Sequence, residues 1–187
     1  IPSVVYGFFA FIYIGPLVME LGEYFYQNGW IDQPPNVLNP INGAIVVGVM
    51  ILPLVASMSE DALRAVPNEL REGSLALGAT KIETTFKVMI QASLSGIIAS
   101  IILALSRAVG ETMAVTLAVG TVAVYTANMF VPAQTMTAYI AQRVGGDLPF
   151  GEIGYLTIFA VGLYLFVITL CLNLLGNKVL SAYREAY

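Results

Sequence analysis

Long apolar segments separated by polar loops dominate the pattern along the chain. Four segments approach the roughly 20 consecutive apolar residues that a helix needs to cross a bilayer. They cover residues 2–19, 41–58, 88 to about 124, and 153–176. The third is too long for one straight span, so we expect a crossed or broken helix there. The pattern predicts an all-α, polytopic transmembrane bundle with four spans.

Composition supports a lipid environment for this chain. Of its 187 residues, 58% are hydrophobic and 11% are charged, whereas a soluble domain carries about 25% charged residues. The chain contains no histidine and only Cys171, which excludes an intrachain disulfide and histidine-based catalytic or metal sites. We expect neither a catalytic nor a metal-binding residue. Because Ile1 lies inside an apolar segment, we also expect that the true beginning of the chain is missing.

The basic residues are distributed unevenly between the polar loops. The loop at residues 59–87 contains four of them: Arg64, Arg71, Lys81 and Lys87. Lys178 and Arg184 follow the last apolar segment, residues 20–40 contain none, and the third loop contains only Arg143. The positive-inside rule therefore places residues 59–87 and the C-terminus in the cytoplasm.

The loop at residues 59–87 also has helix signals. Pro67 suits the first turn of a helix, and Gly78 suits a helix stop because glycine tolerates a left-handed backbone. Thr80 and Glu83 have the spacing of a capping box that begins a second helix. We expect two short helices that meet at Gly78. From the pattern alone, a solvated connector fits equally well, although ordered loops of this length are often functional.

The sequence "REGSLALGATKIETTFKVMI" in and after this loop resembles the coupling-loop signature of ABC-transporter permeases. That signature runs E-A-A, three residues, glycine, nine residues and I-x-L-P. Glu72 takes the glutamate position, Gly73 and Ser74 replace the alanines, Gly78 takes the glycine position, and residues 88–91 form the final tetrapeptide without its proline. We call residues 59–87 the coupling loop.

Two other stretches, "IPSVVYG" and "SRAVGETMAV", resemble the phosphate-specific branch of these permeases, PstC-type first and PstA-type next. Permeases for molybdate, tungstate and sulfate are similar in this region, so these oxyanions remain alternative substrates. The resemblance implies that residues 1–187 are one transmembrane permease domain, the C-terminal part of a longer subunit with about two further spans. It places the subunit in a prokaryotic cytoplasmic (inner) membrane.

The resemblance also implies the partners. They are a second permease subunit, cytoplasmic ATPase subunits and an extracytoplasmic phosphate-binding protein; no nucleic acid is expected. The ATPase would dock on the coupling loop at Glu72, Gly73, Ser74, Gly78, Ala79 and Thr80. ATP and Mg would bind the ATPase and this chain would bind no cofactor, in agreement with its lack of a G-x-x-x-x-G-K-[ST] phosphate loop.

Arg107 and Glu111 are charged residues inside the third apolar segment, four positions apart. Charged side chains in a span usually face a bundle interior or an aqueous path, and a helix would bring this pair onto one face. We predict a substrate path at Arg107, Glu111 and Thr112, where the guanidinium binds phosphate and Glu111 competes for it. Alternatively, the pair only joins helices.

Two other functions remain open. A secondary transporter or channel would use the same charges without an ATPase, and a membrane scaffold would use the coupling loop only for docking. Small residues also recur every fourth position from Ala92 to Gly120, which allows close helix packing. This repeat predicts a crossed or broken packing element at the centre of a dimer, and ordinary packing within a membrane bundle fits it equally well.

Overall fold

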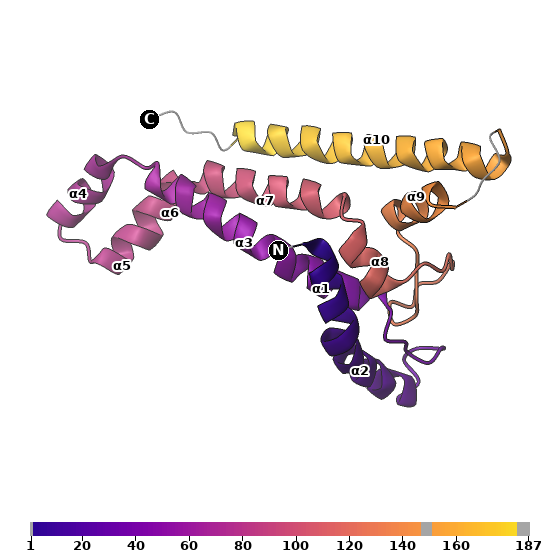
Figure 1. The fold of residues 1–187 in the computed structure, drawn as a ribbon. Helices are drawn as coiled ribbons and strands as arrows, with labels where there is room; N and C mark the ends of the chain where they lie inside the picture. Colours follow the sequence, from indigo (N-terminus) through magenta and orange to yellow (C-terminus); the bar gives the residue numbers. More distant parts are fainter. Residues whose placement is uncertain (1, 147–150, 183–187) are drawn as a thin grey trace. The chain divides into compact units, whose positions relative to one another are not determined.

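The computed structural model describes residues 2–146 and 151–182, and every regular element among them is a helix (Figure 1). The elements are α1 (Ser3–Phe9), the π-helix η1 (Ala10–Ile14), α2 (Gly15–Gln27), α3 (Pro40–Arg64), α4 (Asn68–Ala76), α5 (Lys81–Thr84), the π-helix η2 (Thr85–Met89), α6 (Ile90–Ala92), α7 (Leu94–Val109), α8 (Met113–Val119), α9 (Met136–Val144) and α10 (Ile153–Ala182). The all-α prediction is confirmed. Arg184 lies outside the described residues.

Among the described residues, three stretches of helix are long and apolar enough to cross a membrane. They are Ser3–Gln27, Pro40–Arg64 and Ile153–Lys178, and they match the first, second and fourth predicted spans. Lys81–Ala92 and Leu94–Val109 form a fourth span if they are taken together, bent by 64° at their break. The predicted third span was wrong in its bounds, because the helix ends at Val109 and does not continue to residue 124.

The chain divides into two compact units, residues 1–50 with 110–168 and residues 51–109 with 169–187. In the first unit, a small core forms where α8 packs against the first membrane helix. Its fully buried members are Ala10, Val46, Ala114 and Ala118. Gly7 allows the close approach, since a Cβ at this position would lie 3.0 Å from Ala114 Cα.

Two buried asparagines organise the start of α3 in this first unit. Asn39 caps the helix, because its Oδ1 accepts from Asn42 N at 2.8 Å, and Pro40 suits the first helical position. The Asn42 amide donates to the carbonyl oxygens of Ala10 and Val37 at 3.3 Å and of Ala118 at 3.4 Å. These hydrogen bonds tie α3 to both the first helix and α8.

The second unit contains residues 51–64 of α3, the rest of the coupling loop, α7 and the end of α10. The small residues of α7 pack closely against α3, as predicted. A Cβ at Gly96 would lie 2.5 Å from Ala62 Cβ, and the hydroxyls of Ser100 and Ser59 lie 3.0 Å apart. A polar contact also joins α7 to α10, because Ser106 Oγ donates to Asn173 Oδ1 at 2.7 Å.

Candidate functional site

The coupling loop contains two short helices joined by a tight turn, as predicted from its sequence. α4 ends at Ala76, and Gly78 then adopts φ +85°. A side chain with a Cβ is strained in this left-handed region, whereas glycine is not. Pro67 lies one residue before the first helical residue, Asn68, and not inside the first turn. The change of direction between α4 and α5 therefore depends on Gly78.

The predicted capping box at the start of α5 is confirmed. Thr80 Oγ1 accepts from Glu83 N at 3.3 Å, and Glu83 Oε2 accepts from Thr80 N at 3.0 Å. Hydrogen bonds from the Thr80 backbone N–H and hydroxyl, followed by the charge of Lys87, lower the pKa of Glu83. A lowered folded-state pKa means that the carboxylate stabilises the box at neutral pH, and that this contribution is lost as the pH falls through that pKa.

A hydroxyl pair holds α4 against α5. Ser74 Oγ and Thr84 Oγ1 lie 3.0 Å apart, and Thr84 is only 2% exposed. Ser74 occupies one of the two alanine positions of the coupling signature, so a small side chain at this position fits the close packing of the two helices. Ser74 therefore has a structural contact inside the coupling loop.

The outer surface of the coupling loop exposes large apolar side chains. Leu77 is 91% exposed, Ile82 72% and Phe86 66%, and Ile82 and Phe86 are four residues apart on one continuous helical stretch. Exposed apolar groups within a polar segment indicate an interaction surface. Sequence reasoning missed these three residues, although the i,i+4 spacing of Ile82 and Phe86 in a charged loop was a usable signal.

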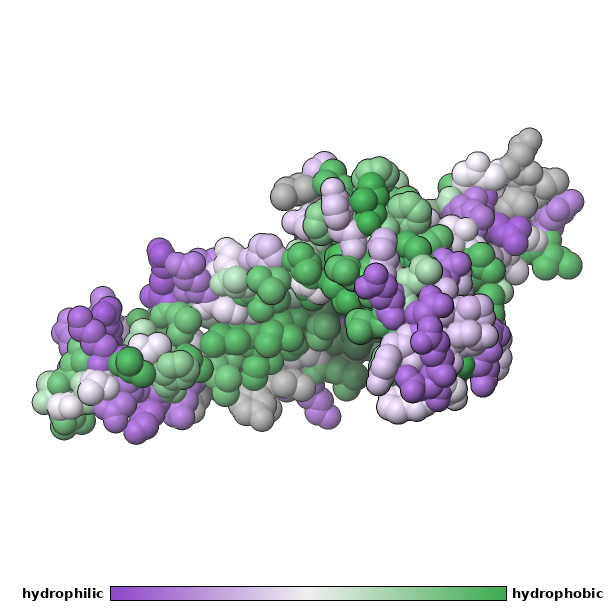
Figure 2. Space-filling model, turned by 90° about the horizontal axis from the view of Figure 1, so that it is seen from below, coloured by the Kyte–Doolittle hydropathy of each residue, from purple (hydrophilic) through white to green (hydrophobic). Residues whose placement is uncertain are grey.

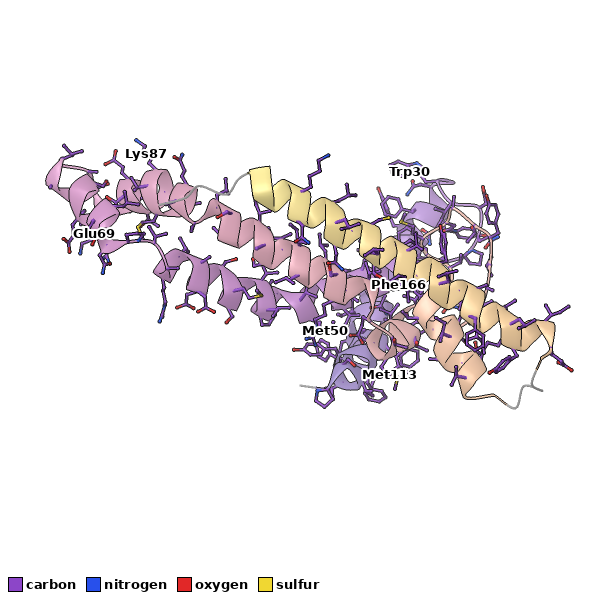
Figure 3. All side chains as sticks on the ribbon, turned by 90° about the horizontal axis from the view of Figure 1, so that it is seen from above. Trp30, Met50, Glu69, Lys87, Met113 and Phe166 are labelled. Carbon is purple, nitrogen blue, oxygen red and sulfur yellow. The ribbon has the colours of Figure 1, made fainter. Side chains whose placement is uncertain are left out.

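The remaining coupling residues differ in their exposure. Glu72 is exposed, Ala79 is half-buried, and no atom lies within 4 Å of a Cβ built on Gly73. Figure 2 shows the mixed polar and apolar surface of α4 and α5 at the left, next to the apolar surface of α3. Figure 3 labels Glu69 and Lys87 on this part of the chain.

The helix that contains Arg107 breaks two residues later, as predicted for this segment. α7 ends at Val109 and α8 begins at Met113. The i,i+4 pairing predicted for Arg107 and Glu111 on one helical face was wrong, because Gly110 and Glu111 are not helical. Arg107 lies exposed in the last turn of α7, and no carboxylate of the described residues forms an ion pair with it.

Glu111 and Thr112 both support the start of α8. Glu111 Oε1 accepts from Ala114 N at 3.3 Å, which places a negative charge at the helix N-terminus, where the helix dipole favours it. The carbonyl of Glu111 accepts from Thr137 Oγ1 of α9 at 2.8 Å, and the carbonyl of Thr112 accepts from Thr116 Oγ1 at 2.6 Å. These contacts give both residues a local structural role, and their part in a substrate path stays a prediction.

Comparison with known proteins places this helical arrangement in a family. Residues 1–184 match the family described as "Binding-protein-dependent transport system inner membrane component". The chain belongs to this family. This is a family of multi-pass permease components of the inner membrane, in agreement with the apolar helices of the chain.

Individual relatives are similar over nearly the whole chain. A "Probable phosphate transport system permease protein PstC" of Methanocaldococcus jannaschii is 34% identical over 99% of this chain and 60% of its own length. The "Phosphate transport system permease protein PstC" of Mesorhizobium japonicum is 32% identical over 96% and 57%. A "Probable ABC transporter permease protein" of Bacillus subtilis is 35% identical over 99% and 56%. No solved structure matches the chain.

Proposed function

We propose that this permease belongs to an ATP-driven importer that carries inorganic phosphate across the cytoplasmic membrane. Two of the similar relatives are phosphate transport permeases by name, and this similarity carries the proposal. The chain spans only 56–60% of the length of the three relatives described above. The proposal therefore concerns the whole subunit, assembled with a second permease subunit and an external phosphate-binding protein.

Uptake by the reconstituted importer tests this function. The full-length subunit, its permease and ATPase partners and the binding protein are placed in proteoliposomes with ATP inside. We expect ATP-dependent uptake of labelled phosphate that molybdate, tungstate and sulfate compete for only weakly. Uptake without ATP would indicate a secondary transporter or channel, and faster uptake of another oxyanion would reassign the substrate.

We propose that Arg107 contacts phosphate along the substrate path. Its guanidinium is exposed and has no ion pair among the described residues, although it lies at the end of a helix built mostly of small and apolar side chains. An Arg guanidinium matches the oxygens of phosphate with two parallel hydrogen bonds. Glu111 and Thr112 are proposed as the neighbouring path residues, where the carboxylate keeps anion binding weak enough for release.

We propose that the coupling loop docks on the ATPase through its exposed apolar surface of Leu77, Ile82 and Phe86. The short helices present these side chains around the Gly78 turn. Glu72, Gly73, Ser74, Ala79 and Thr80 then shape or border the docking surface. In this proposal ATP and Mg bind the ATPase partner. Conformational change in the ATPase is transmitted to this chain through the docking surface.

Replacing Gly78 with valine should uncouple the ATPase. The left-handed backbone at φ +85° strains a β-branched residue by about 1–3 kcal/mol, so the α4–α5 turn should open while membrane insertion stays normal. We expect phosphate uptake and co-purification of the ATPase to fall together.

The matched control for this change is Gly78→Asn. Asparagine tolerates the left-handed region far better than valine, so it should retain most uptake. Equal uptake and equal ATPase recruitment in both variants would show that the turn does not serve docking.

Cysteine labelling tests the proposed orientation. Gln33 and Asn68 are both exposed, one in the first loop and one in the coupling loop, and Cys171 is the residue to remove first. In the Cys171→Ser background, Gln33→Cys should react with an impermeant maleimide added to intact cells. Asn68→Cys should react only after the membrane is opened, and the reverse pattern would invert the topology.

A further inference from the structure

A cavity lies beside the coupling helices, on a different set of residues from the exposed apolar surface. It is lined by side chains from the end of α3, from α4 and from the α5–η2 stretch. Its polar lining includes Arg71 and Lys81, and its apolar lining includes Leu63, Leu75 and Met89. The cavity therefore combines two cations with an apolar wall.

The two cations in the cavity are free to bind an anion. Neither Arg71 nor Lys81 forms an ion pair with any carboxylate in the part of the chain that the structure describes. The other two basic residues of the loop are paired: Arg64 with Glu60 at 2.6 Å and Lys87 with Glu83 at 3.6 Å. Two basic residues of the coupling loop are therefore neutralised by ion pairs, and the other two, Arg71 and Lys81, line the cavity without one.

The hydroxyl groups of the lining already have protein partners. Thr84 bonds to Ser74, and Thr85 Oγ1 donates to the carbonyl oxygen of Lys81 at 2.9 Å. Because these hydroxyls already have partners within the protein, an anion in the cavity would interact mainly with Arg71 and Lys81. An arginine and a lysine together offer eight N–H donors, which suit a phosphate group better than a single carboxylate.

The cavity lies at the level where the membrane helices end. Leu63 is in the last turn of α3, and Met89 ends η2 within the helical stretch that continues into the bent span. Leu63 and Met89 therefore belong to helical stretches that can cross a membrane, and Leu75 belongs to α4. In the proposed orientation, this level is the headgroup region of the cytoplasmic leaflet, which carries the anionic lipids.

We propose that this cavity binds the phosphodiester headgroup of an anionic lipid of the cytoplasmic leaflet. The guanidinium of Arg71 and the ammonium of Lys81 bind the phosphate oxygens, and Leu63, Leu75 and Met89 contact the glycerol and the first carbons of the acyl chain. The bound lipid holds α4 against the membrane end of the coupling loop. This inference rests on the proposed cytoplasmic placement of that loop.

Native mass spectrometry of the assembled full-length transporter tests the proposal with phosphatidylglycerol as the probe and phosphatidylcholine as the neutral reference. Arg71→Gln with Lys81→Gln should weaken retention of phosphatidylglycerol by about thirtyfold, since each basic residue near the membrane surface contributes about 1 kcal/mol and each 1.4 kcal/mol is about tenfold. Arg64→Gln with Lys87→Gln removes the same total charge from the same loop but spares the cavity. We expect this control to retain the lipid.

Three outcomes would overturn the proposal. Equal loss in the two double variants would show attraction by net charge alone, and no loss in either would show that the cavity is not the site. Displacement of the lipid by millimolar inorganic phosphate would indicate a site for the free anion. If the first double variant fails to assemble, Arg71→Lys with Lys81→Arg keeps both charges and should keep the lipid. Retention is measured without transport, so its result is independent of whether phosphate is the substrate, and the cysteine labelling separately tests the leaflet.

Discussion

Replacing Arg107 with lysine should reduce phosphate uptake by about ten- to a hundredfold. Lysine keeps the positive charge but loses the planar fork that binds two phosphate oxygens at once. Hydrogen bonds to charged groups contribute about 1.5–3 kcal/mol, and each 1.4 kcal/mol corresponds to about a tenfold change. Initial rates of ATP-dependent uptake by the reconstituted importer measure the effect.

The control for this experiment is Arg64→Lys, because Arg64 is exposed and paired with Glu60 outside the apolar part of the span. We expect normal uptake from the control and normal recovery of the ATPase with both variants. Near-normal uptake by Arg107→Lys at normal assembly would show that the guanidinium does not contact the substrate.

The contacts of Glu111 decide which of its variants is informative. Exchanging the charges of Arg107 and Glu111 would place a cation at the N-terminus of α8, where Glu111 now accepts from Ala114 N. The helix dipole disfavours a cation there, so the exchange would disturb α8 whether or not the pair touches phosphate. Glu111→Gln retains an oxygen acceptor for Ala114 N and perturbs α8 less than the exchange does, so a change in uptake at unchanged thermal stability of this variant would report on the path.

Local signals were sufficient to predict the coupling loop. Gly78 marks the helix stop, and Thr80 with Glu83 marks the start of the next helix. Both signals act through neighbouring backbone groups, so they can be recognised in the sequence. The structure has the positive φ at Gly78 and both hydrogen bonds of the capping box. The first, second and fourth apolar spans were equally predictable, since bilayer thickness sets their minimum length.

The contacts of Glu111 and of the buried asparagines involve residues that are distant in sequence. Helical spacing suggested an ion pair at Arg107 and Glu111, but the Glu111 carboxylate accepts from Ala114 N of α8 and its carbonyl accepts from Thr137 Oγ1, 26 residues later. Gly110 followed by Thr112 was a usable stop-and-start signal. The role of Asn42 was not predictable, because its amide bonds to Ala118, 76 residues away.

Replacing Gly43 with valine should disrupt the packing of the first unit. A Cβ at Gly43 would overlap with Cγ2 of Val119, and Val119 is only 4% exposed, so it has little space to move. Its carbonyl also accepts from Ala133 N at 3.3 Å, which restrains the backbone after α8. Overpacking of this kind costs about 1–3 kcal/mol, and we expect the upper end because the clash begins at the first added carbon.

Gly48→Val provides the matched control in the same helix. Both glycines lie within α3, so valine changes the intrinsic helix propensity equally at the two positions, but no atom lies within 4 Å of a Cβ at Gly48. Heating of the solubilised full-length subunit, followed by size-exclusion recovery, should show earlier loss of the Gly43→Val protein and a near-native Gly48→Val protein. Equal midpoints would mean that α8 can move away from α3 at little cost. The close contact at Gly43 would then not hold the start of α3 against the helix that follows Arg107.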